Sequence, residues 1–159
     1  MSSTQACCLS AALRSRYCKR RSEENTLVVW TSDNGPMYGH SPNQGYSHLR
    51  GGKAEVYEGG IRVPAIAYWP GMIAASQDPI DMLHVTDLYT TAARVAGATK
   101  LIKNDRVTDG IDQTALLLNG EDHGRRFSMI HYSGAEIGAV RVTDRMKVHF
   151  KGIAILGQP

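Results

Sequence analysis

A carboxylate and a carboxamide stand next to each other where an apolar run of the chain ends. In "LVVWTSDNGP", residues 27–36, Asp33 and Asn34 follow the apolar run and precede the chain breakers Gly35 and Pro36. Their side-chain oxygens are hard ligands, which suit Ca²⁺ or Mg²⁺ rather than zinc. The same residues also favour a turn, because Asn and Asp tolerate a left-handed backbone conformation. On spacing alone, we favour a turn over a cation site.

A glycine-flanked lysine further along the chain is the second candidate for chemistry. In "HLRGGKAEVYEGGIRVP", residues 48–64, Gly51-Gly52 would let the backbone approach another group closely and would present Lys53 as a compact positive charge. A lysine close to a divalent cation suggests a tetrahedral oxyanion bound between the two. The plainer alternatives are that Lys53 is a solvated loop lysine, or that Arg50 is the anion contact.

The elements that must position these residues are short strands joined by a long loop. Residues 26–31 form a continuous β-rich run, typical of a strand covered on both faces in a parallel α/β sheet, where ligands lie beyond the carboxyl ends of the strands. Residues 63–71 predict a second buried strand. Residues 34–60 between them predict a glycine-rich loop, whose length is typical of a functional or a disordered segment. Within that loop we expect a structural ion pair between Glu58 and Arg62.

The C-terminal part combines helices with antiparallel strands. The spacing of apolar residues predicts a helix over 87–96, with Thr86 as its N-cap and Gly97 as its stop, and Asp112 is a candidate cap for a shorter helix. The pattern then changes to period two, which predicts antiparallel strands with one face in water. In the last strand the apolar residues Met146, Val148 and Phe150 alternate with Lys147, His149 and Lys151.

Length, composition and charge place the chain among ordinary globular proteins. It has 159 residues, enough for about one domain, and 42% of them are hydrophobic and 21% charged, which excludes a disordered or fibrous protein. The net charge of +3 comes from residues 1–22, which carry five basic residues and no acidic one. The remaining 13 basic and 15 acidic residues give residues 23–159 a net charge of −2.

The basic arm is open to several interpretations. It could be a transit peptide, a nucleic-acid-binding arm or non-native sequence, and we expect an uninformative leader and no nucleic-acid partner. It contains all three cysteines, Cys7, Cys8 and Cys18, which are too few for a disulfide framework and indicate no compartment. We see no secretory signal, and no run approaches the roughly 20 apolar residues of a transmembrane helix.

Two longer stretches carry a family resemblance. "NTLVVWTSDNGP" at 25–36 and "LRGGKAEVYEGGIRVPAIAYWPG" at 49–71, in this order and spacing, resemble the C-terminal portion of the sulfatase family, arylsulfatase type, in the alkaline-phosphatase-like superfamily. "HVTDLYTTAARVAG" and "AVRVTDRMKVHF" extend the resemblance to about residues 24–151. It implies an α/β fold, with a partial sulfatase sheet over 24–122 and a small antiparallel C-terminal subdomain over 123–159, after the arm of 1–23.

The resemblance also implies a chemistry. Sulfatases hydrolyse sulfate esters of small molecules or glycans with a formylglycine, made from a Cys or Ser in a Cys-x-Pro-Ser-Arg motif, and with a Ca²⁺ or Mg²⁺ ion. Asp33 and Asn34 match the last two metal ligands of the family, and Lys53 matches the lysine that contacts sulfate and assists the leaving group. This match reverses our preference for a plain turn. Family members are often secreted, periplasmic or lysosomal, but the location of this chain is not indicated.

The chain also departs from the family pattern. The formylglycine motif and the first two acidic metal ligands are not found, and "CCLSAAL" at 7–13 has Leu and Ala in place of the motif's Pro and Arg. We therefore expect these residues to be inactive alone and to bind metal weakly. One alternative is a non-enzymatic fragment that pairs with a separate N-terminal half. Another is a phosphoryl-transfer relative, but such relatives often use zinc with several histidines, and no H-x-x-x-H cluster accompanies Asp33 and Asn34.

Overall fold

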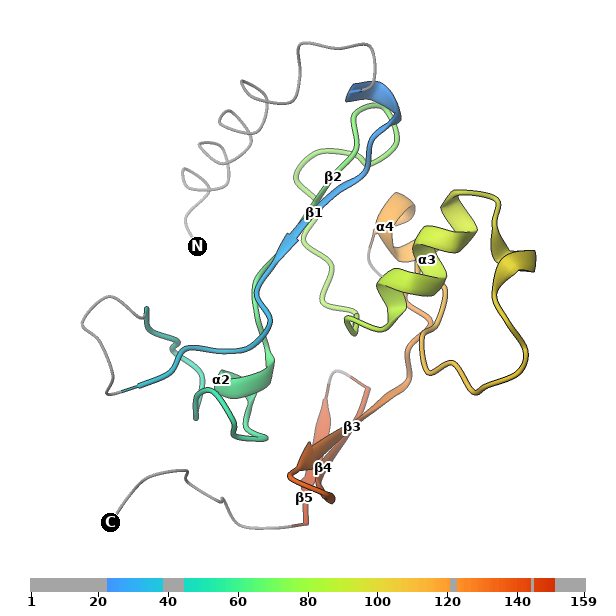
Figure 1. The fold of residues 1–159 in the computed structure, drawn as a ribbon. Helices are drawn as coiled ribbons and strands as arrows, with labels where there is room; N and C mark the ends of the chain where they lie inside the picture. The colour runs from blue at the N-terminus through green and yellow to red at the C-terminus, as the bar shows by residue number, and fades with distance from the viewer. Residues whose placement is uncertain (1–22, 39–44, 121–122, 144, 151–159) are drawn as a thin grey trace.

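The computed structural model describes residues 23–38, 45–120, 123–143 and 145–150, which form two small antiparallel sheets with short helices between and beside them (Figure 1). In chain order the elements are η1 Glu23–Asn25, β1 Val28–Thr31, α2 Glu58–Ile61, β2 Ala65–Tyr68, α3 Asp87–Val95, η2 Thr99–Leu101, α4 Thr114–Asn119, β3 Ser128–Ser133, β4 Glu136–Val142 and β5 Met146–His149, where η marks a 3₁₀ turn. The predicted α/β class is confirmed. The basic arm with its cysteines, and Lys151, lie outside the described residues.

The first sheet pairs β1 with β2 in antiparallel orientation, with Val28 opposite Tyr68. The expectation of a parallel strand covered on both faces is wrong for this pair. The apolar run does mark a strand, but it holds no information on the direction of the partner, which depends on how the long loop and α2 return the chain. Val29 and Trp30 keep 38% and 37% of their surface exposed. This sheet therefore presents apolar side chains to solvent.

Helices α3 and α4 lie where the sequence predicts them. Helix α3 ends just before Gly97, which has a left-handed φ of +67°. Thr86 makes no capping bond with its side chain, and the Asp87 carboxylate instead accepts a backbone N–H of the preceding turn at 2.8 Å. The N-cap residue of α4 is Gln113, one residue after the predicted Asp112, and it makes no capping bond with its side chain, but the Asp112 carboxylate accepts the N–H of Thr114 at 3.0 Å. No helix in the described part of the chain is long and apolar enough to span a membrane.

A buried ion pair ties α3 to the start of the second sheet. Asp87 is fully buried, and Arg126 donates to both of its carboxylate oxygens, through Nε at 2.8 Å and through Nη2 in a shorter contact. The carboxylate also accepts the N–H groups of His84 and Ile111, each at 2.8 Å. Burial alone would raise the pKa of the Asp87 carboxyl, but Arg126 and the two backbone donors outweigh it and lower the pKa below its ordinary value.

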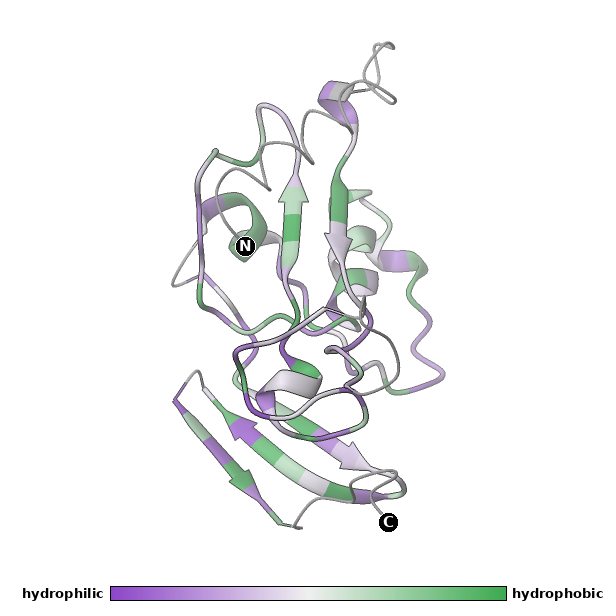
Figure 2. Ribbon diagram, turned by 90° about the vertical axis from the view of Figure 1, so that its left-hand side faces the viewer, coloured by the Kyte–Doolittle hydropathy of each residue, from purple (hydrophilic) through white to green (hydrophobic). Residues whose placement is uncertain are grey.

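The second sheet, β3-β4-β5, confirms the predicted antiparallel strands, and at β5 its apolar side chains face the water. Met146, Val148 and Phe150 are 63%, 53% and 61% exposed, whereas the Lys147 side chain keeps only 10% of its surface exposed. The reason is that Lys147 forms an ion pair with Glu58 of α2, so the charged face of the sheet is turned inward. Helix α2 lies between the two sheets in both views (Figures 1 and 2).

Candidate functional site

Three backbone segments meet beyond the end of β1, at residues 33–36, 49–53 and 58–60. Three backbone hydrogen bonds join them, donated by Gly35 to Gly60 at 2.9 Å, by Lys53 to Pro36 at 2.9 Å and by Gly59 to Arg50 at 2.7 Å. We call this arrangement the glycine junction. It brings the Asp33-Asn34 turn and the Lys53 loop together, although the two are far apart in the sequence.

Glycines are required where these segments touch. A Cβ atom at Gly35 would overlap the carbonyl oxygen of Gly59, and one at Gly60 would overlap the carbonyl oxygen of Gly52. Gly51 has a φ of +81°, a conformation that disfavours other residues. The two Gly-Gly pairs of the sequence thus allow direct backbone contact, which agrees with the predicted close approach at Gly51-Gly52.

The Asp33-Asn34 segment forms the turn that the sequence suggests, and the hydrogen bonds of this turn leave two side-chain oxygens unoccupied. Ser32 Oγ donates to Asn34 O at 2.9 Å, which is a turn hydrogen bond, and Asn34 Nδ2 donates to Gly35 O at 2.9 Å. The second bond occupies the amide nitrogen of Asn34, so its Oδ1 is the atom left to meet a cation. The Asp33 carboxylate is exposed. The two oxygens fit part of a Ca²⁺ or Mg²⁺ site. Among the described residues, no group of three or more His, Cys, Asp and Glu is placed to hold a metal ion.

Lys53 is exposed at the tip of a tight turn of the junction. Glu55 closes this turn, because its carboxylate accepts the N–H of Gly52 at 3.0 Å while its own N–H donates to Gly52 O at 3.1 Å. Ala54, next to Lys53, has a left-handed φ of +73°, which costs a non-glycine residue about 1–2 kcal/mol. Such strain is often found at functional sites.

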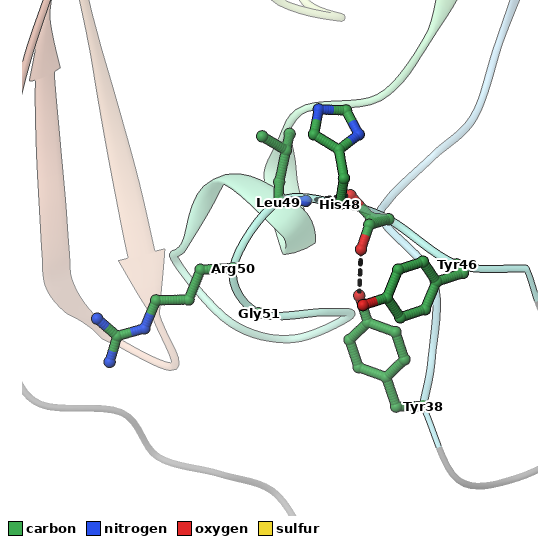
Figure 3. Close-up of a pocket in the computed structure, with 7 residues that line it drawn as sticks. Tyr38, Tyr46, His48, Leu49, Arg50 and Gly51 are labelled. Carbon is green, nitrogen blue, oxygen red and sulfur yellow. Dashed lines mark hydrogen bonds between the residues drawn. The ribbon is translucent and has the colours of Figure 1, made fainter.

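Arg50, the alternative anion contact, is engaged elsewhere. Its guanidinium carbon lies 4.1 Å from the centroid of the Tyr57 ring, a cation–π geometry. In Figure 3 its side chain points away from Tyr38 and Tyr46. The geometry therefore favours Lys53 over Arg50 as the cation available to an anionic ligand.

An open cavity of about 480 Å³ adjoins the junction. Its lining residues are Tyr38, Tyr46, Ser47, His48, Leu49, Arg50 and Gly51 (Figure 3). The Tyr38 and Tyr46 rings have centroids 6.1 Å apart with an angle of 56° between their planes. Tyr38 also lies against Gly52, directly before Lys53. The cavity thus offers aromatic faces next to the candidate anion contact.

The expected ion pair of Glu58 with Arg62 is replaced by another. Glu58 accepts from Arg141 Nη1 of β4 at 2.7 Å and from Lys147 Nζ of β5 at 2.9 Å, while Arg62 reaches Glu58 only through a backbone hydrogen bond of 2.7 Å. Burial would raise the pKa of the Glu58 carboxyl, but Lys147 and Arg141 outweigh it and lower the pKa. A spacing of four residues suggested the wrong partner, because partners from a distant sheet leave no local signal.

His131 of β3 was not singled out by the sequence. It is only 6% exposed, and its Nε2 is the one buried side-chain nitrogen or oxygen without a hydrogen-bond partner among the described residues. Burial, together with the charge of Lys147, lowers the pKa of His131 to about 4. The ring is therefore neutral near pH 7.

Comparisons with known proteins agree with the resemblance seen in the sequence. A model of the sulfatase family matches residues 17–98. The chain is 39% identical over 132 residues to N-acetylgalactosamine-6-sulfatase of Canis lupus familiaris, covering 82% of this chain and 24% of that protein. It is 40% identical over 122 residues to steryl-sulfatase of Rattus norvegicus, covering 73% and 21% respectively.

Solved structures give the same result. The crystal structure of the PsFucS1 sulfatase from Pseudoalteromonas sp. superposes with a TM-score of 0.79 at 40% sequence identity. The match covers 89% of this chain and 28% of that one. The chain thus spans about a quarter of the length of the curated relatives that it matches.

Proposed function

Because the chain belongs to the sulfatase family, we propose that its described residues form the part of a sulfate-ester hydrolase that supplies two metal ligands and the sulfate-contacting lysine. The observation that carries this proposal is the glycine junction, which holds the Asp33-Asn34 turn and the Lys53 loop together through backbone hydrogen bonds.

Asp33, Asn34 and Lys53 have different roles in this proposal. The Asp33 carboxylate and Asn34 Oδ1 would hold a Ca²⁺ or Mg²⁺ ion, which would supply Lewis-acid polarisation of the sulfate oxygens. Lys53 Nζ donates a hydrogen bond to the sulfate and stabilises the negative charge that develops on the leaving oxygen. The backbone hydrogen bond from Lys53 to Pro36 supports this role, because it holds the lysine loop beside the Asp33-Asn34 turn.

The substrate class is a sulfated small molecule or glycan. The relatives named above are, by their names, sulfatases for N-acetylgalactosamine 6-sulfate and for steryl sulfate. Tyr38 and Tyr46 support a ring-bearing leaving group here, because aromatic faces pack well against the flat or apolar faces of such rings. No Cys-x-Pro-Ser-Arg motif stands in the 159 residues, and "CCLSAAL" lies outside the described ones. We therefore expect these residues to bind without turnover when alone.

A second candidate is a non-enzymatic fragment that pairs with a separate N-terminal half. The exposed apolar side chains of β1, such as Val29 and Trp30, favour it, because a two-stranded sheet with free edges invites further pairing. Co-purification of a polypeptide that carries Cys-x-Pro-Ser-Arg would support this candidate. Turnover by the chain alone would contradict it.

The assay is hydrolysis of a chromogenic aryl sulfate with added Ca²⁺, with metal analysis of the purified chain. We expect no release of chromophore and no stoichiometric zinc. Clear turnover that Lys53→Ala abolishes and that the exposed control Lys100→Ala retains would contradict the inactivity. Stoichiometric zinc would instead favour a phosphoryl-transfer relative.

A further inference from the structure

Three consecutive residues, Val56, Tyr57 and Glu58, fasten the glycine junction to the C-terminal sheet. Val56 is 7% exposed and lies against Gly138 of β4. The Tyr57 ring lies 4.9 Å, centroid to centroid, from His149 of β5. Glu58 contributes the two ion pairs described above. The junction therefore rests on the inward face of β4 and β5 through packing, ring contact and charge.

Glu58 is the most directional of these contacts. Its two carboxylate oxygens are each held by a different cation, Oε2 by Arg141 and Oε1 by Lys147. The three side chains keep only 28%, 17% and 10% of their surface exposed. Charge-assisted hydrogen bonds that are partly shielded from water are stronger than exposed ones. Because two strands hold one carboxylate, its orientation is fixed from two directions.

The position of Glu58 is transmitted directly to the candidate site. The next two residues are Gly59, whose N–H donates to Arg50 O of the Lys53 loop, and Gly60, whose carbonyl accepts the N–H of Gly35. The two glycines lie in direct contact with the backbone of the Lys53 loop, because a Cβ at either glycine would overlap a backbone carbonyl of that loop. A shift of Glu58 therefore moves the peptide groups that bind both the cation-ligand turn and the lysine loop.

We propose that Glu58, held by Arg141 and Lys147, is a positioning residue that sets the placement of Lys53 relative to the Asp33-Asn34 cation ligands. The inference rests on the proposed function, since it concerns how the same site is kept in register. A merely structural ion pair would stabilise the whole fold evenly. A positioning residue acts locally, at the junction, before the rest of the fold is affected.

The test is amide hydrogen exchange by NMR on the full chain, with a titration of CaCl₂ in the presence of sodium sulfate. In Glu58→Gln we expect the amides of Gly35, Lys53 and Gly59 to exchange about tenfold faster, the change expected from the loss of one charge-assisted hydrogen bond. Exchange in α3 should stay within about twofold of wild type. Half-saturation of the sulfate-induced shift at Lys53 should need several times more ligand.

Milder variants keep the test valid if Glu58→Gln fails to fold. Lys147→Met leaves Arg141 in place and should show the same local pattern to a smaller degree, and Lys147→Arg should restore wild-type exchange. Asp105→Asn, which disturbs the exposed pair of Asp105 with Arg106 (2.9 Å apart), is the control and should change nothing at the junction.

The outcomes separate the two proposals. Even acceleration of all amides in Lys147→Met, or unchanged exchange at Gly35 and Lys53 in Glu58→Gln, would overturn the positioning role. If the local acceleration is seen but the wild-type chain shows no Ca²⁺- or sulfate-dependent shift at Asp33, Asn34 or Lys53, the mechanical link is supported and the proposed function fails.

Discussion

The buried pair of Asp87 and Arg126 should be the most sensitive point of the fold, and Arg126→Met tests it. Methionine roughly keeps the length and apolar volume of the arginine stem but removes the guanidinium. Asp87 is fully buried and would keep only the two backbone N–H donors of His84 and Ile111. Removing one partner of a buried ion pair costs about 3–5 kcal/mol, because the other charge stays buried without compensation.

The chain contains a matched control for this experiment. Arg106 pairs with Asp105 in the same two-point manner, through Nε at 2.9 Å and Nη2 at 3.2 Å, but these side chains are 70% and 55% exposed. Water screens exposed pairs and little stability is lost with them. Arg106→Met should therefore leave the unfolding midpoint close to that of the wild type.

The assay is urea unfolding followed by circular dichroism and Trp fluorescence. With a loss of about 3–5 kcal/mol and a denaturant slope of about 1–3 kcal/mol per molar, Arg126→Met should lower the midpoint by about 1–5 M urea. The double variant with Asp87→Asn should lose less than the sum of the two single variants, because no charge is then left buried. The reasoning is refuted if Arg126→Met lowers the midpoint no more than Arg106→Met.

Three further predictions concern the junction and the second sheet. The pKa of His131 is about 4 in the folded chain and about 6.5 in the unfolded chain. As the pH falls through this range, the imidazole is protonated in the unfolded chain before it is protonated in the folded chain, so the folded state loses stability. The difference in pKa corresponds to at most about 3 kcal/mol of stability. In urea unfolding measured across this pH range, the midpoint should therefore depend less on pH in His131→Gln than in the wild type. Gly60→Ala should cost about 3 kcal/mol or more, because its Cβ would overlap the carbonyls of Gly52 and Glu55, and a thermal melt would show this as a lower midpoint. Ala54→Gly should slightly raise the melting midpoint, because glycine avoids the cost of about 1–2 kcal/mol that the positive φ imposes on alanine and loses only about 0.5–1 kcal/mol in chain entropy. Ala54→Val should lower the midpoint in the same melts, because a β-branched side chain is a stronger outlier at positive φ than alanine.

Local patterns in the sequence predicted the parts of the fold that depend on local physics. Helix α3 follows from the spacing of its apolar residues and from Gly97, and the three C-terminal strands follow from their period-two alternation. The meeting of the Asp33-Asn34 turn with the Lys53 loop was anticipated from the resemblance and from the two Gly-Gly pairs. The roles of these residues remain predictions.

The features that the sequence did not predict depend on partners that lie far away in the chain. The antiparallel pairing of β1 with β2 depends on the path of the loop, and an apolar run does not encode it. The inward face of β5 was not predicted, because alternation shows that two faces differ but not which one is covered. Lysine side chains usually face water, but Lys147 is turned toward the interior because it forms an ion pair with Glu58.

The central claim is that Asp33, Asn34 and Lys53 form one cation–sulfate site, and an NMR titration tests it most directly. Ca²⁺ should shift the Asn34 side-chain amide and the backbone signals of residues 33–35 in a saturable way, and sulfate should then shift the Lys53 signals only when Ca²⁺ is present. Asp33→Asn should abolish both effects. Equal shifts in wild type and Asp33→Asn, or sulfate binding near Lys53 that is independent of Ca²⁺, would contradict the account.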